Sequence, residues 1–183
     1  MHCMNRSFHI HNYFTCISIS GLPGVGKYVG GIVSEMTNYP VMSIGDCVHN
    51  LARKEGVNSD HFIDQHARLF ACERGLSGGG IVQGVLSTYV VPEPAFRVLL
   101  ILRDTIRFAR IAERESLTSG DSIELLHDRE QSMLSRLHAA YPETVEWNLL
   151  DVSYAHLVID TERLDPKEIA GIIVRVFRRY HRD

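Results

Sequence analysis

The chain has 183 residues, 45% of them hydrophobic and 22% charged, with a formal net charge of −3. This length predicts a single globular domain whose core is large enough to fold without disulfides or a structural metal. The slightly acidic balance excludes the strongly basic surface that binds nucleic acid, and no apolar run reaches the roughly 18 residues of a membrane span. We therefore expect small molecules as partners, with no nucleic acid and no membrane.

Cysteine spacing and the first residues bear on the location of the protein and on its domain limits. The four cysteines form no C-x-x-C pair, which argues against a zinc site and a disulfide framework; they are Cys3, Cys16, Cys47 and Cys72. The N-terminus lacks the basic start and continuous apolar core of a signal peptide. The sequence predicts a soluble, cytoplasmic protein with an extension at residues 1–13 and one domain at residues 14–183.

The first elements of that domain are a strand, a glycine-rich segment and a helix. An apolar run from Phe14 to Ser20 predicts the strand, and Val29 to Met36 carries the helical period. Asn38-Tyr39-Pro40 ends this helix, because the residue before a proline disfavours the helical conformation. A short second strand is expected near Val41 to Ser43.

Two helices and then two strands are predicted next. The helices run from Asp46 through Arg53 and from Ser59 through Arg74. A glycine triplet leads into a third strand from Ile81 to Leu86, and a fourth strand runs from Phe96 to Leu102. A further helix is expected from Asp104 to Glu115.

The last third of the chain predicts a connection, two helices and a final strand. Leu117 to Ser122 is polar, and we expect a flexible connection there to a charged helix from about Ser122 to Tyr141. A loop from Trp147 to Tyr154 leads to a strand at His156 to Ile159, followed by a helix from Pro166 to Arg179. Strands that alternate with helices predict an α/β domain with a parallel sheet of about five strands between helices.

The glycine-rich segment after the first strand matches the phosphate-binding loop G-x-x-x-x-G-K of nucleotide-binding proteins. Glycines let successive backbone N–H groups face a phosphate, the helix N-terminus adds partial positive charge, and Lys27 adds a full one. Tyr28 stands where a Ser or Thr hydroxyl normally binds Mg²⁺, and a phenol cannot reach that place. The expected contacts to a nucleoside triphosphate are Gly21, Gly24, Val25, Gly26, Lys27 and Tyr28.

Further segments, taken in order, resemble the cytidylate kinase-like members of the nucleoside monophosphate kinase family, particularly their compact archaeal form. Ser43-Ile44-Gly45-Asp46 is similar to the S-x-G-E/D entry to the acceptor helices, and Ile81-Val82-x-Gly84 to the strand V-V-L-E-G-R. The segment from Arg107 to Glu115 resembles the helix R-x-x-R-I-A-x-R-E. Arg129-Glu130 with Arg136 and Tyr141 resembles the lid R-E-x₅-R-Y, and Asp151 to Thr161 resembles D-x-S-x-Y-D-L-V-I-N-T.

This resemblance implies a P-loop NTPase fold with a helical acceptor insert at about residues 45–75 and a short arginine-bearing lid at about residues 116–140. It also implies ATP and Mg²⁺ as cofactors and transfer of the γ-phosphoryl group to a nucleoside monophosphate, CMP or dCMP. Such transfer gathers negative charge that fixed cations stabilise. The catalytic cations it implies are Lys27, Arg110, Arg114, Arg129 and Arg136.

Helical spacing puts each pair of these arginines on one face. Arg110 and Arg114 are four residues apart, and Arg129 and Arg136 are seven apart, which is two turns. The alternative is an ordinary solvated face on which Glu115 and neighbouring acids pair with the arginines. On the acceptor side the resemblance implies Ser43, Asp46, His49, Arg53, Asp64, Arg68 and Gly84, with Asp46 either beside the metal or a helix N-cap.

The chain departs from the family at the acceptor phosphate. His49 and Val85 stand where the family has the two arginines that hold this phosphate. Three explanations follow: a kinase with a rearranged acceptor site, a kinase for another small acceptor such as a sugar acid or polyol, or a non-catalytic nucleotide-binding regulator or complex subunit. Tyr28 favours the last explanation, whereas Lys27 and the lid arginines favour catalysis.

Overall fold

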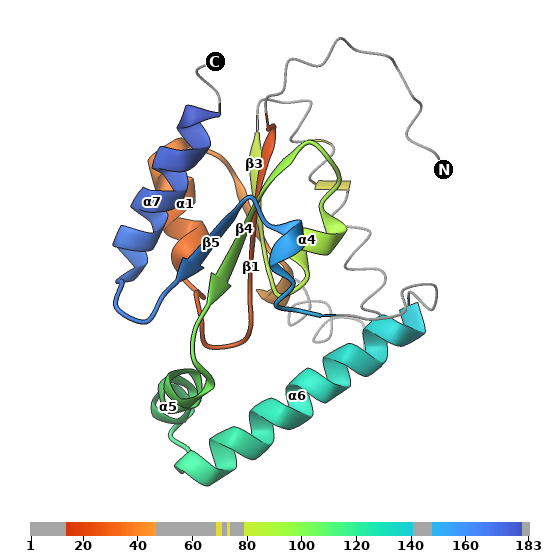
Figure 1. The fold of residues 1–183 in the computed structure, drawn as a ribbon, viewed down its shortest axis with the longest axis vertical. Helices are drawn as coiled ribbons and strands as arrows, with labels where there is room; N and C mark the ends of the chain where they lie inside the picture. Colours follow the sequence, from red (N-terminus) through yellow and green to blue (C-terminus); the bar gives the residue numbers. More distant parts are fainter. Residues whose placement is uncertain (1–13, 47–68, 71–72, 74–78, 141–147, 181–183) are drawn as a thin grey trace.

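A parallel β-sheet forms the centre of the protein (Figure 1). The computed structural model describes residues 14–46, 69–70, 73, 79–140 and 148–180. Within this part of the chain the sheet has five strands in the order β2-β3-β1-β4-β5: β2 Val41–Ser43, β3 Gly80–Gln83, β1 Cys16–Gly21, β4 Ala95–Ile101 and β5 Leu157–Asp160. All neighbouring pairs are parallel. The predicted α/β class and parallel sheet are confirmed.

The central strands are apolar because both of their faces are covered. Ile17 of β1 pairs with Ile81 of β3 on one side and with Phe96 of β4 on the other. All three side chains are fully buried. The sheet therefore carries the main core and holds the carboxyl ends of β1, β3 and β4 side by side.

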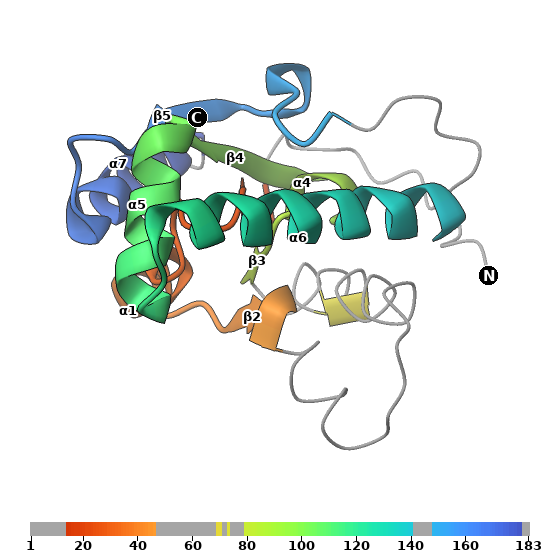
Figure 2. The same cartoon turned by 90° about the horizontal axis from the view of Figure 1, so that it is seen from below.

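Helices α1 (Val29–Thr37) and α7 (Pro166–Arg179) lie next to each other on one face of the sheet in both views (Figures 1 and 2). Val33 of α1 and Ile173 of α7 are fully buried there. Asp165 begins α7 with a capping box, since its side chain accepts hydrogen bonds from the N–H groups of Lys167 and Glu168. These local signals explain why the predicted ends of both helices are confirmed.

Helix α5 (Asp104–Glu115) was predicted with these bounds, but the element after it differs from the prediction. Helix α6 spans Ser119–Ala140, so residues 119–122 of the segment that we expected to be flexible are helical. Thr118 explains the earlier start, because its hydroxyl accepts a hydrogen bond from the N–H of Asp121 at 3.2 Å. Figures 1 and 2 show α6 running past the carboxyl edge of the sheet.

The third strand also differs: β3 ends at Gln83 rather than at Leu86, and a short helix α4 (Ser87–Val90) follows the turn. The buried hydroxyl of Ser20 holds this turn, since it donates to the carbonyl of Val85 at 2.8 Å and accepts from the N–H of Thr88 at 3.2 Å. The predicted loop before β5 contains a 3₁₀ turn, η1 (Val152–Tyr154).

The predicted helices 46–53 and 59–74 lie largely outside the described residues. Asp46, Leu69, Phe70 and Glu73 are described, and all four are helical. Among the residues that the structure describes, no helix is both long and apolar enough to cross a membrane.

Candidate nucleotide-binding site

The loop between β1 and α1 has the backbone of a phosphate cradle. Gly24 has φ +93°, a conformation that favours glycine, and a Cβ there would lie 3.0 Å from side-chain atoms of both Arg107 and Ile111. A Cβ at Gly26 would collide with the side chain of Leu100. The loop can therefore lie close against β4 and α5 only because these two positions are glycine.

The cradle leaves donors available for an anion. Val25 donates its N–H to Leu22 O at 3.2 Å. Within the described part of the chain, the backbone N–H groups of Gly24, Gly26 and Lys27 have no protein acceptor. They lie where α1 begins, so the positive end of the helix dipole adds to them. This arrangement suits the phosphates of a nucleotide.

Lys27 and Tyr28 lie at the exposed end of the loop. The Lys27 ammonium group is 5.9 Å from the centroid of the Tyr28 ring and forms no ion pair with a described carboxylate. Tyr28 is 65% exposed and occupies the N-cap of α1, without a side-chain hydrogen bond to the helix. The phenol thus extends into solvent, and Lys27 keeps its full charge available for a phosphate.

Gln83, the last residue of β3, ties the loop to the sheet. Its side-chain amide donates to Gly26 O at 2.7 Å and to Lys27 O at 3.1 Å, and its carbonyl accepts from Gly30 N at 2.8 Å. Gln83 was not among the site residues predicted from the motifs. Its position at the carboxyl end of a strand was the available signal, because ligands of parallel α/β sheets bind at that edge.

Arg107, also missed as a site residue, connects the loop with helix α6. Its side chain is only 2% exposed, forms an ion pair with Glu130 of α6, and bonds Asp104 Oδ1 at 2.8 Å. The same side chain lies against Gly24. Arg107 therefore links α6 to the phosphate loop.

The remaining predicted cations are the four arginines of α5 and α6. Arg110 donates to Thr161 O at 3.3 Å, which joins α5 to the loop after β5. Arg114 pairs with Glu115 at 2.7 Å, in agreement with the solvated-face alternative. Arg129 and Arg136 lie on α6, and their side chains are outside what the structure describes. The described contacts do not bring these arginines together around Lys27.

Another ion pair lies at the carboxyl edge of the sheet, beyond β4 and β5. Arg103 donates to both carboxylate oxygens of Glu162. These hydrogen bonds lower the pKa of the Glu162 carboxyl, which stays ionised as the partner of the guanidinium. The pair fixes the loop after β5 that Arg110 also contacts.

Three of the predicted acceptor residues lie within the described structure. Ser43 is the last residue of β2, and its hydroxyl accepts from Asp46 N at 3.3 Å, so Ser43 rather than Asp46 caps the turn. Asp46 is exposed, and Gly84 lies against Ile44. The other four predicted acceptor residues are outside the described part: His49, Arg53, Asp64 and Arg68. Val85 packs against the main core.

The residues at the loop do not fit an ordinary Mg²⁺ site. Such a site uses a Ser or Thr of the loop and an Asp from a neighbouring strand, whereas this chain has Tyr28 and Gln83 there. The oxygen of Gln83 already accepts from Gly30. Among the described residues, no group of three or more His, Cys, Asp or Glu side chains could hold a metal ion.

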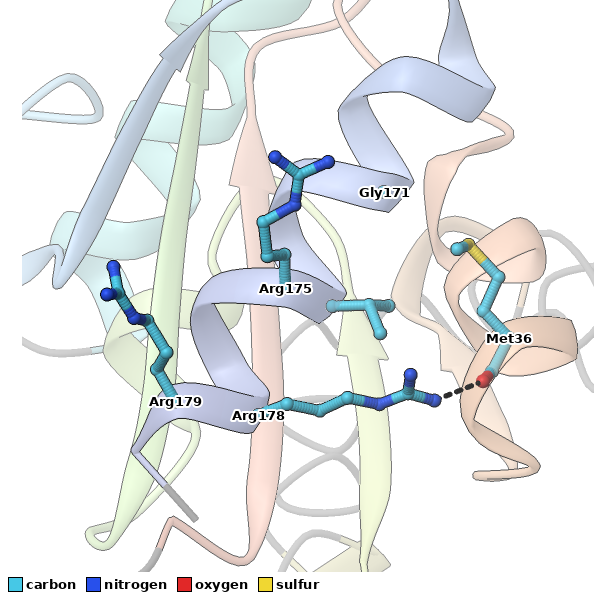
Figure 3. A pocket seen from close by; sticks show the side chains of 6 residues that line it. Met36, Gly171, Arg175, Arg178 and Arg179 are labelled. Carbon is cyan, nitrogen blue, oxygen red and sulfur yellow. Dashed lines mark hydrogen bonds between the residues drawn. The ribbon is translucent and has the colours of Figure 1, made fainter. Parts of the chain in front are cut away.

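A basic hollow of about 450 Å³ lies between α1 and α7, far from this loop. It is at the carboxyl end of α1, about 13 Å along the helix from the loop at 1.5 Å per residue. Figure 3 shows Arg178 reaching across to the carbonyl of Met36, at 3.0 Å, while Arg175 and Arg179 extend elsewhere. The hollow is therefore not part of the nucleotide site.

The parallel sheet in this strand order, with the phosphate loop between β1 and α1, places the protein in the P-loop class of nucleotide-binding α/β proteins, which includes the P-loop kinases. Solved structures share the fold at under 20% identity. A protein of Eubacterium ventriosum superposes with a TM-score of 0.67 at 15% identity, covering 90% of this chain and 98% of its own. A gluconokinase of Sinorhizobium meliloti gives 0.55 at 19%, covering 91% and 94%.

Curated relatives identify the family. The cytidylate kinase of Sulfurisphaera tokodaii is 31% identical over 173 residues, which cover 86% of this chain and 92% of the relative. That of Pyrobaculum islandicum is 30% identical over 159 residues, covering 81% and 84%. No family model matches the chain. The chain belongs to the cytidylate kinase family, as the resemblance of its motifs predicted.

Proposed function

We propose that the protein transfers the γ-phosphoryl group of ATP to a nucleoside monophosphate, with CMP or dCMP as the acceptor. The observation that carries this proposal is the cradle beside Lys27, whose N–H groups have no acceptor among the described residues, in a chain of the cytidylate kinase family. Such a cradle holds the β- and γ-phosphates of a nucleoside triphosphate.

On the donor side, the chain's own residues bind and orient the triphosphate. The N–H groups of Gly24, Gly26 and Lys27 meet the phosphate oxygens, and the Lys27 ammonium group offsets the charge that moves during transfer. Arg110 and Arg114 on α5 are proposed as further cations. Arg129 and Arg136 on α6 have the same proposed role, and the Arg107–Glu130 ion pair positions the helix that carries them.

On the acceptor side, the monophosphate is proposed to lie beyond the carboxyl edge of β2 and β3. Ser43 ends β2 and Gly84 follows β3, and both strands end at the same edge as β1 because all three are parallel. Asp46, His49, Arg53, Asp64 and Arg68 complete the proposed acceptor site. With no arginine at positions 49 and 85, the acceptor loses charge-assisted hydrogen bonds of about 1.5–3 kcal/mol each, and we propose that Arg53 and Arg68 replace them.

The family usually uses Mg²⁺ with ATP, and Mg²⁺ would neutralise phosphate charge when bound. Asp46 is the one proposed metal ligand, because Tyr28 and Gln83 do not supply the loop hydroxyl and the strand carboxylate that usually hold the metal.

The test is ADP production by the purified protein with Mg-ATP and a panel of CMP, dCMP, UMP, dUMP, AMP, GMP and small polyol acids. Acceptor-dependent turnover should be greatest with CMP or dCMP and should be lost in Lys27→Ala. Lys167→Ala is the matched control, because Lys167 is an exposed residue of α7. Turnover that survives in Lys27→Ala would contradict the proposal.

Tyr28 favours a second candidate, a nucleotide-binding regulator or complex subunit without transfer. The position that normally supplies the metal hydroxyl carries a phenol that is 65% exposed. ATP binding without turnover on any acceptor of the panel would support this candidate. Turnover with a polyol acid alone would instead indicate a small-molecule kinase.

A further inference from the structure

We propose that Gln83 fixes the phosphate loop in place of a metal site, so that the loop binds nucleotide phosphates almost equally well with and without Mg²⁺. This inference rests on the nucleotide binding of the proposed function, and it does not require phosphoryl transfer. It concerns the residue that the family resemblance left unassigned between Ile81-Val82 and Gly84.

The hydrogen bonds of Gln83 need an amide. Its nitrogen donates to two loop carbonyls, Gly26 O and Lys27 O, while its oxygen accepts from Gly30 N in the first turn of α1. A carboxylate has only acceptors, so it would face both carbonyls with a repulsive contact. Glutamine, with a donor and an acceptor on one planar group, satisfies all three partners.

Gly30 belongs to the same arrangement. A Cβ at this position would collide with the Gln83 amide, so the close approach of β3 to the first turn of α1 depends on glycine there. Gln83 holds the backbone on both sides of the Lys27 side chain, because it donates to the carbonyls of Gly26 and Lys27 and accepts from the N–H of Gly30. The loop is thereby held in one conformation before any ligand binds, which lowers the ordering cost of binding.

The place of Gln83 in the sheet is the place of a metal-binding acid. It pairs with Ile19 of β1, and the loop begins two residues after Ile19 with Gly21. P-loop proteins hold Mg²⁺ through a strand acid and the loop hydroxyl. In this chain Gln83 stands in place of the strand acid and Tyr28 in place of the loop hydroxyl. Gln83 hydrogen-bonds the loop backbone, and the Tyr28 ring lies beside the Lys27 ammonium group. Phosphate charge is then met by backbone N–H groups and Lys27.

The test compares ATP affinity of the full chain by calorimetry in excess Mg²⁺ and in EDTA. We expect the two dissociation constants to agree within about threefold. In Gln83→Glu, binding in EDTA should weaken by more than tenfold, since the carboxylate repels the two loop carbonyls and the phosphates, and Mg²⁺ should restore much of it. Gln131→Glu, the same change on an exposed position of α6, should behave like the parent.

Each outcome of the calorimetry either supports or contradicts metal-independent binding. A parent protein that loses tenfold or more of its ATP affinity in EDTA would overturn the inference, as would Gln83→Glu that behaves like Gln131→Glu. The parent measurement holds even if Gln83→Glu fails to fold. Metal-independent binding without turnover would contradict the proposed transfer alone, binding that requires Mg²⁺ would contradict this inference alone, and no ATP binding in either condition would contradict both.

Discussion

Basic side chains lie near both ends of helix α1, yet only the amino end is built to hold a phosphate. At the amino end, Lys27 lies beside backbone N–H groups that have no acceptor in the described structure. At the carboxyl end, three arginines of α7 line a hollow, and Arg178 bonds the carbonyl of Met36. Those arginines complement the negative ends of α1 and α7. Fixed backbone donors, and not the number of basic side chains, distinguish the nucleotide site.

The largest expected effect comes from replacing Arg107, the buried residue that supports the phosphate loop at the amino end of α1. Arg107→Met leaves Glu130 without its partner, and breaking such a pair costs about 3 kcal/mol of the free energy of unfolding. Urea unfolding followed by circular dichroism measures this change. Arg103→Met, which removes the exposed pair with Glu162, should change the midpoint far less. Equal shifts in both variants would contradict the buried role of Arg107.

Lys27→Ala tests the comparison directly. We expect ATP affinity to fall at least tenfold, because the ammonium group is the one full positive charge placed within the loop. Arg178→Ala removes a cation at the other end of α1 and should leave ATP affinity unchanged. Calorimetric titration of both variants gives the answer, and an equal loss in the two would mean that overall charge decides binding.

Gly24→Ala tests the backbone of the cradle. The φ of +93° and the contacts with Arg107 and Ile111 should cost about 1–2 kcal/mol of the free energy of unfolding, with a weaker affinity for ATP. Gly31→Ala is the matched control, since a Cβ there meets open space within α1 and should stabilise the helix by about 0.5–1 kcal/mol. Thermal unfolding of the two variants should therefore shift in opposite directions.

The smallest expected change concerns the metal. Tyr28→Thr restores a short hydroxyl at the start of α1 and should raise any Mg²⁺-dependent turnover by a few-fold, about 1 kcal/mol or less of barrier. ADP production at several Mg²⁺ concentrations measures it. An unchanged dependence on Mg²⁺ would show that Tyr28 is not what limits the metal at this loop.

Local signals in the sequence determine much of the fold. The phosphate loop and the helices ending at Thr37, Glu115 and Arg179 follow from glycine spacing, from proline and from the apolar period, all of which act within a few residues. The Thr118 cap of α6 was also a local signal, but the polar residues around it led us to predict a flexible connection there. The family itself followed from motifs in shared order.

Only the tertiary structure decided the contacts between distant segments. Gln83 bonds residues more than 50 positions away, and Ser20 ends β3 early through hydrogen bonds to residues 64–68 positions ahead. Arg107 is buried because α6 folds back over α5 and brings Glu130 to it. A sequence pattern reports the neighbours of a residue along the chain, whereas the partner of a buried polar group depends on which strands and helices the fold brings together. The sequence by itself determined the loop and its family, and the tertiary structure decided what holds the loop in place.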